Sequence, residues 1–349
     1  MISALLAVAL AAPPAPAPVK VLFAGDVTLG FHYEEYVSGT TDAGAPRSSA
    51  WGFEKVGART RSADLFVVNL ECPFTESNER LPKNFNFRAS PKLADALVAG
   101  GVDVVSLANN HQMDFGATGL ADTIATLDAQ KIVHFGAGLD LARARAPALV
   151  EKNGVRFAFL GYFFLGDRNI EPKEVIATDH TPGVAGHHDD LKTVRAWVEA
   201  DVKAARAKAD VVIPFFHWGR EGHGEPEPYQ VELAHAAIDA GAAAVIGSHP
   251  HVLQGMEQYQ GRPILYSLGN FVFGGNWNPT DKRTALVELT FDKKGYQSAL
   301  VLPAFSDDYP KSPVQPYLAE GDEAAAGLAH LRELSQGFKQ PLPALDDKR

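Results

Sequence analysis

The chain has 349 residues, 46% of them hydrophobic, which is ample for a large buried core in one domain or two. Its formal net charge is -10 and it contains no block of Lys and Arg, so a nucleic-acid-binding surface is not expected. Cys72 is the single cysteine, which excludes an intramolecular disulfide and thiolate-rich metal clusters. Any bound metal must therefore be held by nitrogen and oxygen ligands.

The first residues indicate targeting rather than a fold element. Residues 2–12 are a short apolar run, Ala9-Leu10-Ala11 resembles a small-residue cleavage site, and Ala-Pro repeats follow to Val19. We therefore expect residues 1–19 to be a signal remnant and the protein to be exported, to the periplasm or the extracellular space. Because the run lacks the positively charged start of a full signal peptide, a soluble cytoplasmic protein is the alternative.

From Lys20 onward, short apolar strands alternate with Ala-rich helices. We expect strands at 20–24, 65–69, 103–107, 157–162, 211–216, 243–247, 264–268 and 285–291, and helices at 91–100, 119–131, 190–208 and 229–240. This alternation predicts an α/β architecture with mostly parallel strands. The main domain is expected to span 20–305, followed by a C-terminal extension, 306–349, with a helical pattern at 322–334.

Metal-ligating residue types follow five of these strands. In open α/β sheets, ligands bind beyond the carboxyl ends of the strands, so side chains that follow different strands meet at one rim. The candidates, in chain order, are Asp26, Glu71, Asn110, His217, and the pair His249 and His251. Carboxylate, carboxamide and imidazole donors suit one or two divalent transition ions such as manganese, iron or zinc.

Two such ions would need a shared anionic ligand, and Glu71 is the natural bridge. A metal pair can lower the pKa of a water molecule from about 15.7 toward about 7 and so make it a nucleophile. Each residue also has an ordinary structural interpretation. Asp26 could cap a turn, Glu71 could be a solvated loop acid, and His217 could be a satisfied core residue. The joint placement after five strands favours the metal site.

An ordered set of motifs resembles the CapA family of capsule and poly-γ-glutamate biosynthesis, within the calcineurin-like metallophosphoesterase superfamily. The motifs are Gly25-Asp26-Val27-Thr28, Asn69-Leu70-Glu71, Ala108-Asn109-Asn110-His111 with Asp114, His217-Trp218-Gly219, Gly247-Ser248-His249-Pro250-His251 and Ser267-Leu268-Gly269-Asn270. The resemblance implies a four-layer α-β-β-α sandwich of mixed sheets with a two-metal site on one edge.

The resemblance also implies a role for each site residue. One metal would be held by Asp26, Glu71 and His251, and the other by Glu71, Asn110, His217 and His249. His111 would stabilise the transition state or protonate a leaving group, and Asp114 would orient it. Typical members of the superfamily have a histidine two residues after the first aspartate, where this chain has Thr28, and an aspartate where it has Glu71. The first metal site is therefore expected to lack one ligand.

Four further residues are candidates for substrate contact: Arg88, Arg220, Glu221 and Asn270. The guanidinium fork of Arg88 could grip a carboxylate or a phosphate, although pairing with a nearby acid is an equal alternative. The cluster His187-His188-Asp189-Asp190 precedes an expected helix, so Asp189 or Asp190 is interpreted as its N-cap rather than as a metal ligand.

Three functions remain open at this point. The first is a metal-dependent hydrolase or transferase in capsule or poly-γ-glutamate synthesis or export, acting on a phosphoester or an acidic amide-linked polymer through a metal-activated water. The second is a non-catalytic, polymer-handling component of a capsule assembly system with membrane partners. The third is a metallophosphatase of small substrates.

Overall fold

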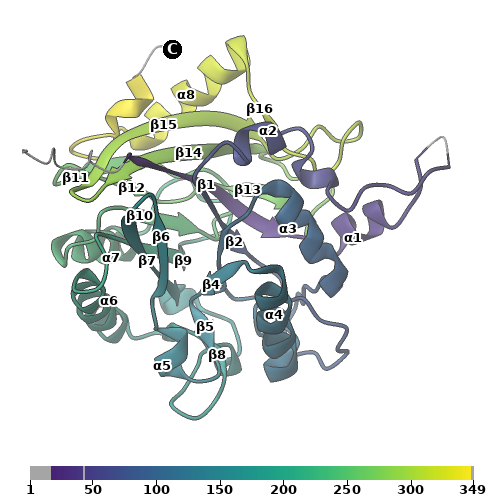
Figure 1. Cartoon of the computed structure of the whole chain (residues 1–349), viewed down its shortest axis with the longest axis horizontal. Coiled ribbons are helices and arrows are strands. Elements are labelled where there is room, and N and C mark those ends of the chain that lie inside the picture. The colour runs from purple at the N-terminus through teal and green to yellow at the C-terminus, as the bar shows by residue number, and fades with distance from the viewer. Residues whose placement is uncertain (1–16, 42–43, 347–349) are drawn as a thin grey trace, which may run out of the picture.

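The computed structural model describes residues 17–41 and 44–346, and Figure 1 shows their arrangement. The expected signal remnant therefore lies, as far as residue 16, outside the described residues. The described chain forms two large mixed β-sheets with helices on their outer faces, which confirms the α/β class. Within that part of the chain, none of the helices combines the length and the apolar character that crossing a membrane requires.

The first sheet has eight strands, in the order β16-β15-β14-β1-β2-β3-β4, with β13 paired to the end of β1. Its strands are β1 (Val19–Thr28), β2 (Leu65–Leu70), β3 (Val104–Ser106), β4 (Val133–Phe135), β13 (Asn270–Phe273), β14 (Arg283–Asp292), β15 (Gly295–Phe305) and β16 (Tyr317–Leu318). The run from β1 to β4 is parallel, whereas β14, β15 and β16 are antiparallel. The expectation of mostly parallel strands is therefore correct for the centre and wrong for this edge.

The second sheet has six strands, in the order β11-β12-β10-β9-β7-β6. They are β6 (Ala148–Lys152), β7 (Val155–Phe164), β9 (Val211–Trp218), β10 (Val245–Ser248), β11 (Met256–Tyr259) and β12 (Arg262–Leu265). The central strands β7, β9, β10 and β12 run parallel, and β6 and β11 form antiparallel edges. A short pair, β5 (Ala137–Gly138) and β8 (Gly183–Val184), lies beside them.

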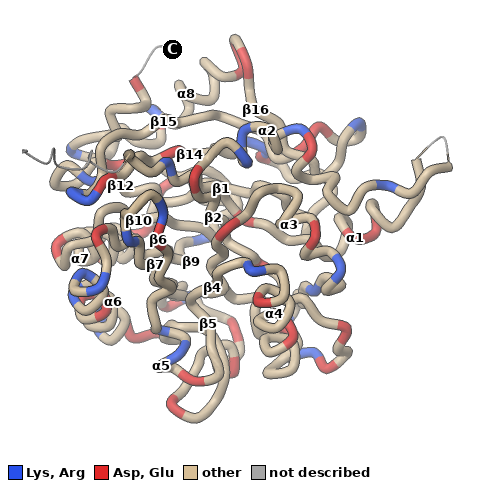
Figure 2. The backbone as a smooth tube through the Cα atoms, viewed as in Figure 1, with Lys and Arg blue, Asp and Glu red and all other residues tan. Residues whose placement is uncertain are grey.

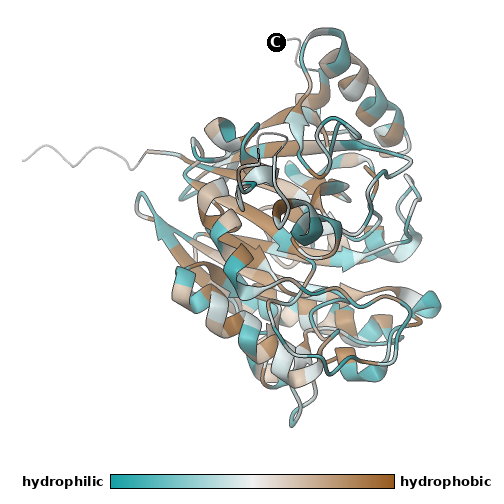
Figure 3. Ribbon diagram, turned by 90° about the vertical axis from the view of Figure 1, so that its right-hand side faces the viewer, coloured by the Kyte–Doolittle hydropathy of each residue, from teal (hydrophilic) through white to brown (hydrophobic). Residues whose placement is uncertain are grey.

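Alternation of side chains along the strands divides most of the interior into three large cores. Val21 and Phe23 of β1 face a core shared by both sheets, where they meet strands such as β7 and β9. Leu22 lies in a second core, which also contains residues of α3 (Ala94–Gly100) and α4 (Gly116–Gln130). A third core joins the second sheet to α6 (Leu191–Arg206) and α7 (Pro228–Asp239). Figure 3 shows the apolar colouring gathered in the strands.

The remaining helices are short, apart from the last. They are α1 (His32–Val37), α2 (Gly57–Thr60), α5 (Leu141–Ala144) and α8 (Gly321–Ser335). Asp190 caps α6 by accepting hydrogen bonds from the backbone N–H groups of Lys192 and Thr193, which confirms its predicted role. In the C-terminal extension, β16 pairs with β15, and Leu331 of α8 is buried in the core that both sheets share.

A close approach of two backbones places β13 beside the end of β1. The strand is irregular between Phe23 and Asp26, and the Asp26 N–H donates to Gly269 O at 3.0 Å. A Cβ atom at Gly25 would lie 1.7 Å from that same oxygen, so only glycine fits there. Gly25 therefore sets the position of Asp26.

We expect Gly25→Ala to lower the free energy of unfolding by about 3 kcal/mol, because the new methyl group would push β1 and the Gly269 backbone apart. Urea denaturation of the two proteins measures this difference. Gly337→Ala is the matched control, since its Cβ would meet nothing within 4 Å. Equal stabilities for the Gly25 and Gly337 variants would contradict the argument.

Candidate metal centre

The carboxyl ends of strands from both sheets bring five ligand-type side chains together. Asp26 belongs to β1, Glu71 directly follows β2, His217 lies near the end of β9, and His249 and His251 follow β10. Asp26 and His217 were expected just after their strands, and this detail is wrong because β1 and β9 extend past them. The convergence of the five side chains is nevertheless the one predicted.

Glu71 lies at the centre of the cluster, close to ligand atoms of several other residues. Its Oε1 lies 3.7 Å from Nε2 of His217 and 3.7 Å from Nε2 of His251. Ligand atoms of Glu71, His249 and His251 all lie within 4.8 Å of one another, and so do those of Asp26, Glu71 and His217. Two overlapping sets with one common carboxylate suit a bridged pair of cations.

Asn110 completes the cluster after β3. Its Oδ1 lies 2.9 Å from Nε2 of His217, which is also 3.0 Å from Nδ1 of His249. On the other side, His251 Nδ1 lies 3.3 Å from Asp26 Oδ2. All six predicted metal ligands are therefore in one place.

The burial of Glu71 tests whether a cation fits. Its Oε1 is buried and accepts no hydrogen bond from any described residue. An unpaired carboxylate oxygen in an apolar interior is costly, whereas a divalent ion would compensate the charge. The donor set of two carboxylates, three imidazoles and one carboxamide is the type that manganese, iron and zinc accept.

The pKa shifts within the cluster also indicate that a positive charge would be stabilised there. Burial, followed by the charge of Asp26, raises the pKa of Glu71 well above its usual value. Burial lowers the pKa values of His217 and His249, so these imidazoles are neutral at pH 7 and able to coordinate. Burial opposes the charged form of His251 as well, but the hydrogen bond and charge of Asp26 prevail and raise its pKa.

The turn that holds the two last histidines is strained. His249 has φ of 97° and His251 has φ of 57°, a region that costs residues with a side chain about 1–3 kcal/mol each. The backbone N–H of His249 faces Asp26 Oδ2 at 3.3 Å, which helps to hold the turn. Such strain is typical of functional sites.

A chain of carboxamides orients the carboxylates. Asn69 Nδ2 donates to Asp26 Oδ1 at 2.8 Å and to Glu71 Oε2 at 3.2 Å. Asn109 Nδ2 in turn donates to Asn69 Oδ1 at 3.0 Å. Asn69 and Asn109 lie in the motifs at or just after the ends of β2 and β3, and their role in holding the carboxylates emerges only from the fold.

His111 and Asp114 form a hydrogen-bonded pair beside the cluster. His111 Nδ1 lies 2.7 Å from Asp114 Oδ2, and Phe87 stacks on the imidazole at 4.1 Å between ring centroids. Lys83 Nζ lies 2.9 Å from Asp114 Oδ1 and 2.7 Å from Glu171 Oε2. The predicted pair is present, but Lys83 and Glu171 were missed.

Glu171 links this pair to the metal ligands. Asn110 Nδ2 donates to Glu171 Oε1 at 3.0 Å, which leaves the amide oxygen of Asn110 facing His217. The Lys83–Glu171 ion pair therefore fixes the orientation of a candidate ligand. No sequence spacing signals it, because both residues come from loops far apart in the chain.

Thr28 stands where typical members of the superfamily have a histidine, and its side chain is not directed to the cluster as a ligand would be. Its hydroxyl donates to Glu71 O at 3.1 Å and so supports the backbone. The nearby carboxylate of Asp26 contributes to only one of the two ligand sets.

The candidate substrate residues are distributed over three places. Arg220 and Glu221 line a hollow of about 490 Å³ that also contains His111 and His249. Asn270 Oδ1 lies 2.9 Å from His251 Nδ1 and so supports a candidate ligand. Arg88 is not brought to the cluster.

Instead, Arg88 hydrogen-bonds within its own loop, to Ser77 O and to Asn78 Oδ1, the latter at 3.0 Å. It lines a separate hollow with Phe31 and Phe115. The hydrogen bonds of Arg88 therefore go to loop oxygens, and not to the carboxylate of a nearby acid as the alternative expected.

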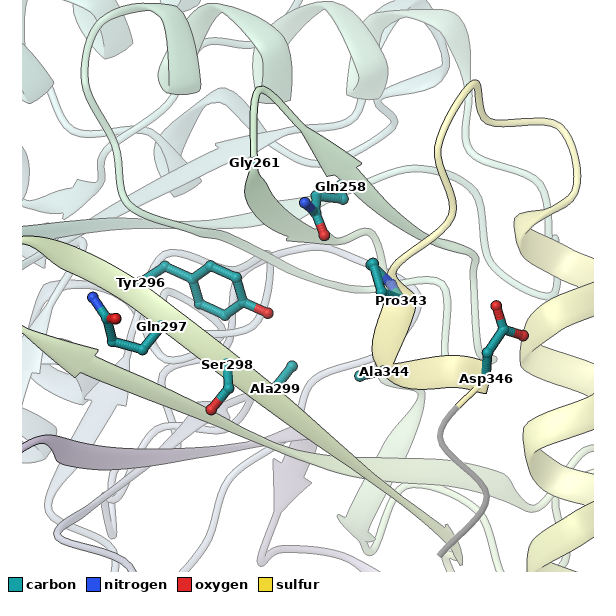
Figure 4. Close-up of a pocket in the computed structure, with 9 residues that line it drawn as sticks. All are labelled: Gln258, Gly261, Tyr296, Gln297, Ser298, Ala299, Pro343, Ala344 and Asp346. Atoms are coloured by element: carbon teal, nitrogen blue, oxygen red, sulfur yellow. The ribbon is translucent and has the colours of Figure 1, made fainter.

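A hollow of about 630 Å³ lies elsewhere, between β15, the β11–β12 turn and the 3₁₀ helix at Pro343–Asp346. Figure 4 shows its polar side chains, among them Gln258, Tyr296 and Ser298. Its lining includes one carboxylate, Asp346, and no imidazole. Of these two places, the histidine cluster is therefore the better candidate for a metal-binding or catalytic site.

The family model described as bacterial capsule synthesis protein PGA_cap matches residues 20–275. The chain belongs to this family. Among PGA_cap relatives, the capsule biosynthesis protein CapA of Bacillus anthracis is 32% identical over 304 residues, covering 83% of this chain and 70% of that protein. The PGA biosynthesis protein CapA of Bacillus subtilis (strain 168) is 32% identical over 296 residues, covering 84% and 73%.

A third relative of this chain is a probable polyglutamine synthesis accessory protein of Mycobacterium tuberculosis (strain ATCC 25618 / H37Rv). It is 35% identical over 224 residues, covering 64% of this chain and 59% of that protein. The family assignment confirms the resemblance read from the motifs, and all six candidate ligands lie within the matched region.

We expect Glu71→Gln to weaken binding of manganese or zinc by at least about tenfold, because it removes the shared anionic ligand and keeps the side-chain volume. Metal content after dialysis, measured by mass spectrometry, reports the loss, and His249→Ala with His251→Ala should abolish binding. Glu257→Gln is the matched control, since Glu257 is a buried glutamate that bonds to His235. Unchanged metal content in Glu71→Gln would refute the assignment.

Metal affinity should fall as the pH falls. Glu71 and His251 both have raised pKa values in the metal-free protein, so protons compete with the ion and binding releases them. Calorimetric titration in two buffers of different ionisation enthalpy, between about pH 6 and about pH 8, measures the protons released. The Glu71→Gln variant should release fewer; a pH-independent affinity for the unaltered protein would contradict this.

Proposed function

We propose that this protein is a divalent-metal-dependent hydrolase or transferase of capsule assembly, acting on an acidic, amide-linked polymer. The observation that supports a metal site is the buried Oε1 of Glu71, which has imidazoles around it and no hydrogen-bond donor among the described residues. The names of the relatives support the polymer, since they refer to capsule, PGA and polyglutamine synthesis.

The order of layers supports the proposed scaffold. Helices cover the outer face of each sheet, and the two sheets share a core, so the sequence of layers is helix, sheet, sheet, helix. We take this to be the four-layer sandwich of a calcineurin-like metallophosphoesterase. In the arrangement that the family resemblance implies, Asp26, Glu71 and His251 would hold one ion, and Glu71, Asn110, His217 and His249 would hold the second. The two groups whose donor atoms lie within 4.8 Å of one another divide the histidines differently, but the contacts of His251 with Asp26 and of His217 with Asn110 and His249 support the division proposed here.

Bound at this site, manganese, iron or zinc would polarise the substrate and lower the pKa of water. The chain's own residues then have defined tasks. His111 bonds Asp114 through its Nδ1, which leaves Nε2 to accept a proton from the attacking water and pass it to the leaving group. Lys83 lies between Asp114 and Glu171, so its one positive charge is shared by the two carboxylates and keeps both in place. The aromatic ring of Phe87 restrains the imidazole of His111.

Cations beside the cluster support an anionic substrate. Charged residues of both signs are spread over the helices and loops of the molecule (Figure 2). Arg168 and Arg220 nevertheless line the hollow that contains His111 and His249. Guanidinium groups bind carboxylates and phosphates in a forked geometry, so this hollow suits a polymer rich in carboxylates.

Thr28 favours a second candidate, a non-catalytic polymer-handling component. Its hydroxyl is bonded to Glu71 O, so the Asp26 side of the cluster has one ligand fewer than in typical members of the superfamily, which have a histidine at this position. A site of this kind can bind metal and polymer without turnover. Both candidates place the protein with membrane partners of capsule synthesis, and we propose that it is exported to meet them.

We expect His111→Ala to retain the metal and to lose about 10²–10⁴-fold in turnover, because the proton donor to the leaving group is removed. Turnover is measured with manganese, iron or zinc on polyglutamate and on a generic phosphodiester. His235→Ala is the control, since His235 stacks on Tyr259 and bonds to Glu257, apart from the cluster.

The substrates also separate the two candidates. Turnover of polyglutamate that is lost in His111→Ala supports the amide hydrolase, and turnover of the phosphodiester alone points to a phosphoesterase. No turnover of either substrate by metal-loaded protein would favour the polymer-handling component.

A further inference from the structure

Two hollows meet at the histidine cluster. The first, named here the His249 hollow, has about 490 Å³ and includes His111, Arg168, Arg220 and His249. The second, the His251 hollow, has about 750 Å³ and includes His251, Asn270, Asn276 and Thr280. Glu221 lines both, so the two hollows adjoin at one residue.

The strained turn divides the two histidines between the hollows. His249 and His251 flank Pro250, and their ring centroids are 5.9 Å apart with the ring planes at 50°. His249 lines the first hollow and His251 the second, while Glu71 has an atom near both side chains. The candidate metal centre therefore lies between two openings and not at the blind end of one.

The walls of the two hollows differ in chemistry. The His249 hollow has three cations, Lys83, Arg168 and Arg220, against two carboxylates, Glu171 and Glu221, and is bordered by two exposed apolar side chains, Phe85 and Ile170, which are 68% and 83% exposed. Lys83 is paired with Glu171, and Arg168 lies 4.0 Å from Glu227, so Arg220 and the exposed Arg168 are the groups left to meet an anion. The His251 hollow offers the amides of Asn270 and Asn276 between apolar residues. Arg283 in that hollow is already paired with Asp281 at 2.7 Å.

We propose that a linear acidic chain lies across both hollows, so that the bond acted on is internal to the chain. Carboxylates of one segment would meet Arg168 and Arg220, and the amide backbone of the other segment would meet Asn270 and Asn276. A small substrate would need only one hollow. This inference rests on the proposed function, which it refines from an acidic polymer to attack within an extended chain.

The step itself is a hydrolysis of an internal amide. The oxygen of water forms a bond to the carbonyl carbon and gives up one proton to His111 Nε2; the carbon–nitrogen bond then breaks, and the nitrogen leaves as an amine with that proton. One product chain then occupies each hollow. Both products are themselves chains, whereas an enzyme that trims ends would release one short product.

The first experiment measures binding of polyglutamate chains to the manganese-loaded protein. A chain long enough to fill both hollows should bind roughly tenfold more tightly than one that fills only the His249 hollow. Thr280→Trp should block the His251 hollow, since Thr280 is exposed there, and should abolish this gain while short chains bind as before. Ser298→Trp, in the hollow of Figure 4, is the matched control and should keep the gain.

The second experiment follows cleavage of long polyglutamate labelled at one end. Internal attack gives labelled fragments of many lengths from the earliest times. Release of short end products only, or equal affinity for short and long chains, would overturn the inference and leave the proposed hydrolase intact. A length-dependent gain in binding that Thr280→Trp removes, without any cleavage, would instead support the continuous groove while refuting hydrolysis.

Discussion

The carboxylate of Glu71 is the constraint on which the rest of the site depends. It is fully buried, its Oε1 has no hydrogen-bond donor among the described residues, and two imidazoles lie 3.7 Å away. A negative charge in this position destabilises the fold unless it is protonated or paired with a cation. The same burial keeps the imidazoles of His217 and His249 neutral, so these two residues supply no positive charge to balance the Glu71 carboxylate.

Several costs of the fold are concentrated around this carboxylate. His249 and His251 adopt positive φ, and Gly25 and Gly247 lie where a Cβ would be 1.7 Å and 2.1 Å from a backbone oxygen. These close approaches bring β1 against the Gly269 backbone just before β13, and β10 against the Tyr266 backbone just after β12, so that side chains from the two sheets share one space. The large cores of the two sheets offset such local costs, because strain at a few residues is small beside the burial of whole strands.

Much of this arrangement follows from the sequence, because ligand types after parallel strands converge for topological reasons. The positions of Glu71, His249 and His251 were predictable in this way. The antiparallel strand β15 was not, since residues 295–305 mix polar and apolar side chains and pair at the sheet edge. Lys83 and Glu171 could not be found either, because their ion pair depends on two loops that meet only in the folded chain.

The two departures from the family resemblance, Thr28 and Glu71, are physically coupled. The Thr28 hydroxyl donates to Glu71 O at 3.1 Å, and the Glu71 N–H donates to Val27 O at 2.8 Å, so the end of β1 fixes the Glu71 backbone from both sides. A histidine at position 28 could not make this hydroxyl hydrogen bond. With its backbone held there, Glu71 uses its additional methylene, relative to aspartate, to bring Oε1 between His217 and His251. In the proposed site, the absence of a histidine at position 28 and the longer carboxylate would thus be coupled, because the Thr28 hydroxyl anchors the Glu71 backbone and the additional methylene lets Oε1 reach between the two imidazoles.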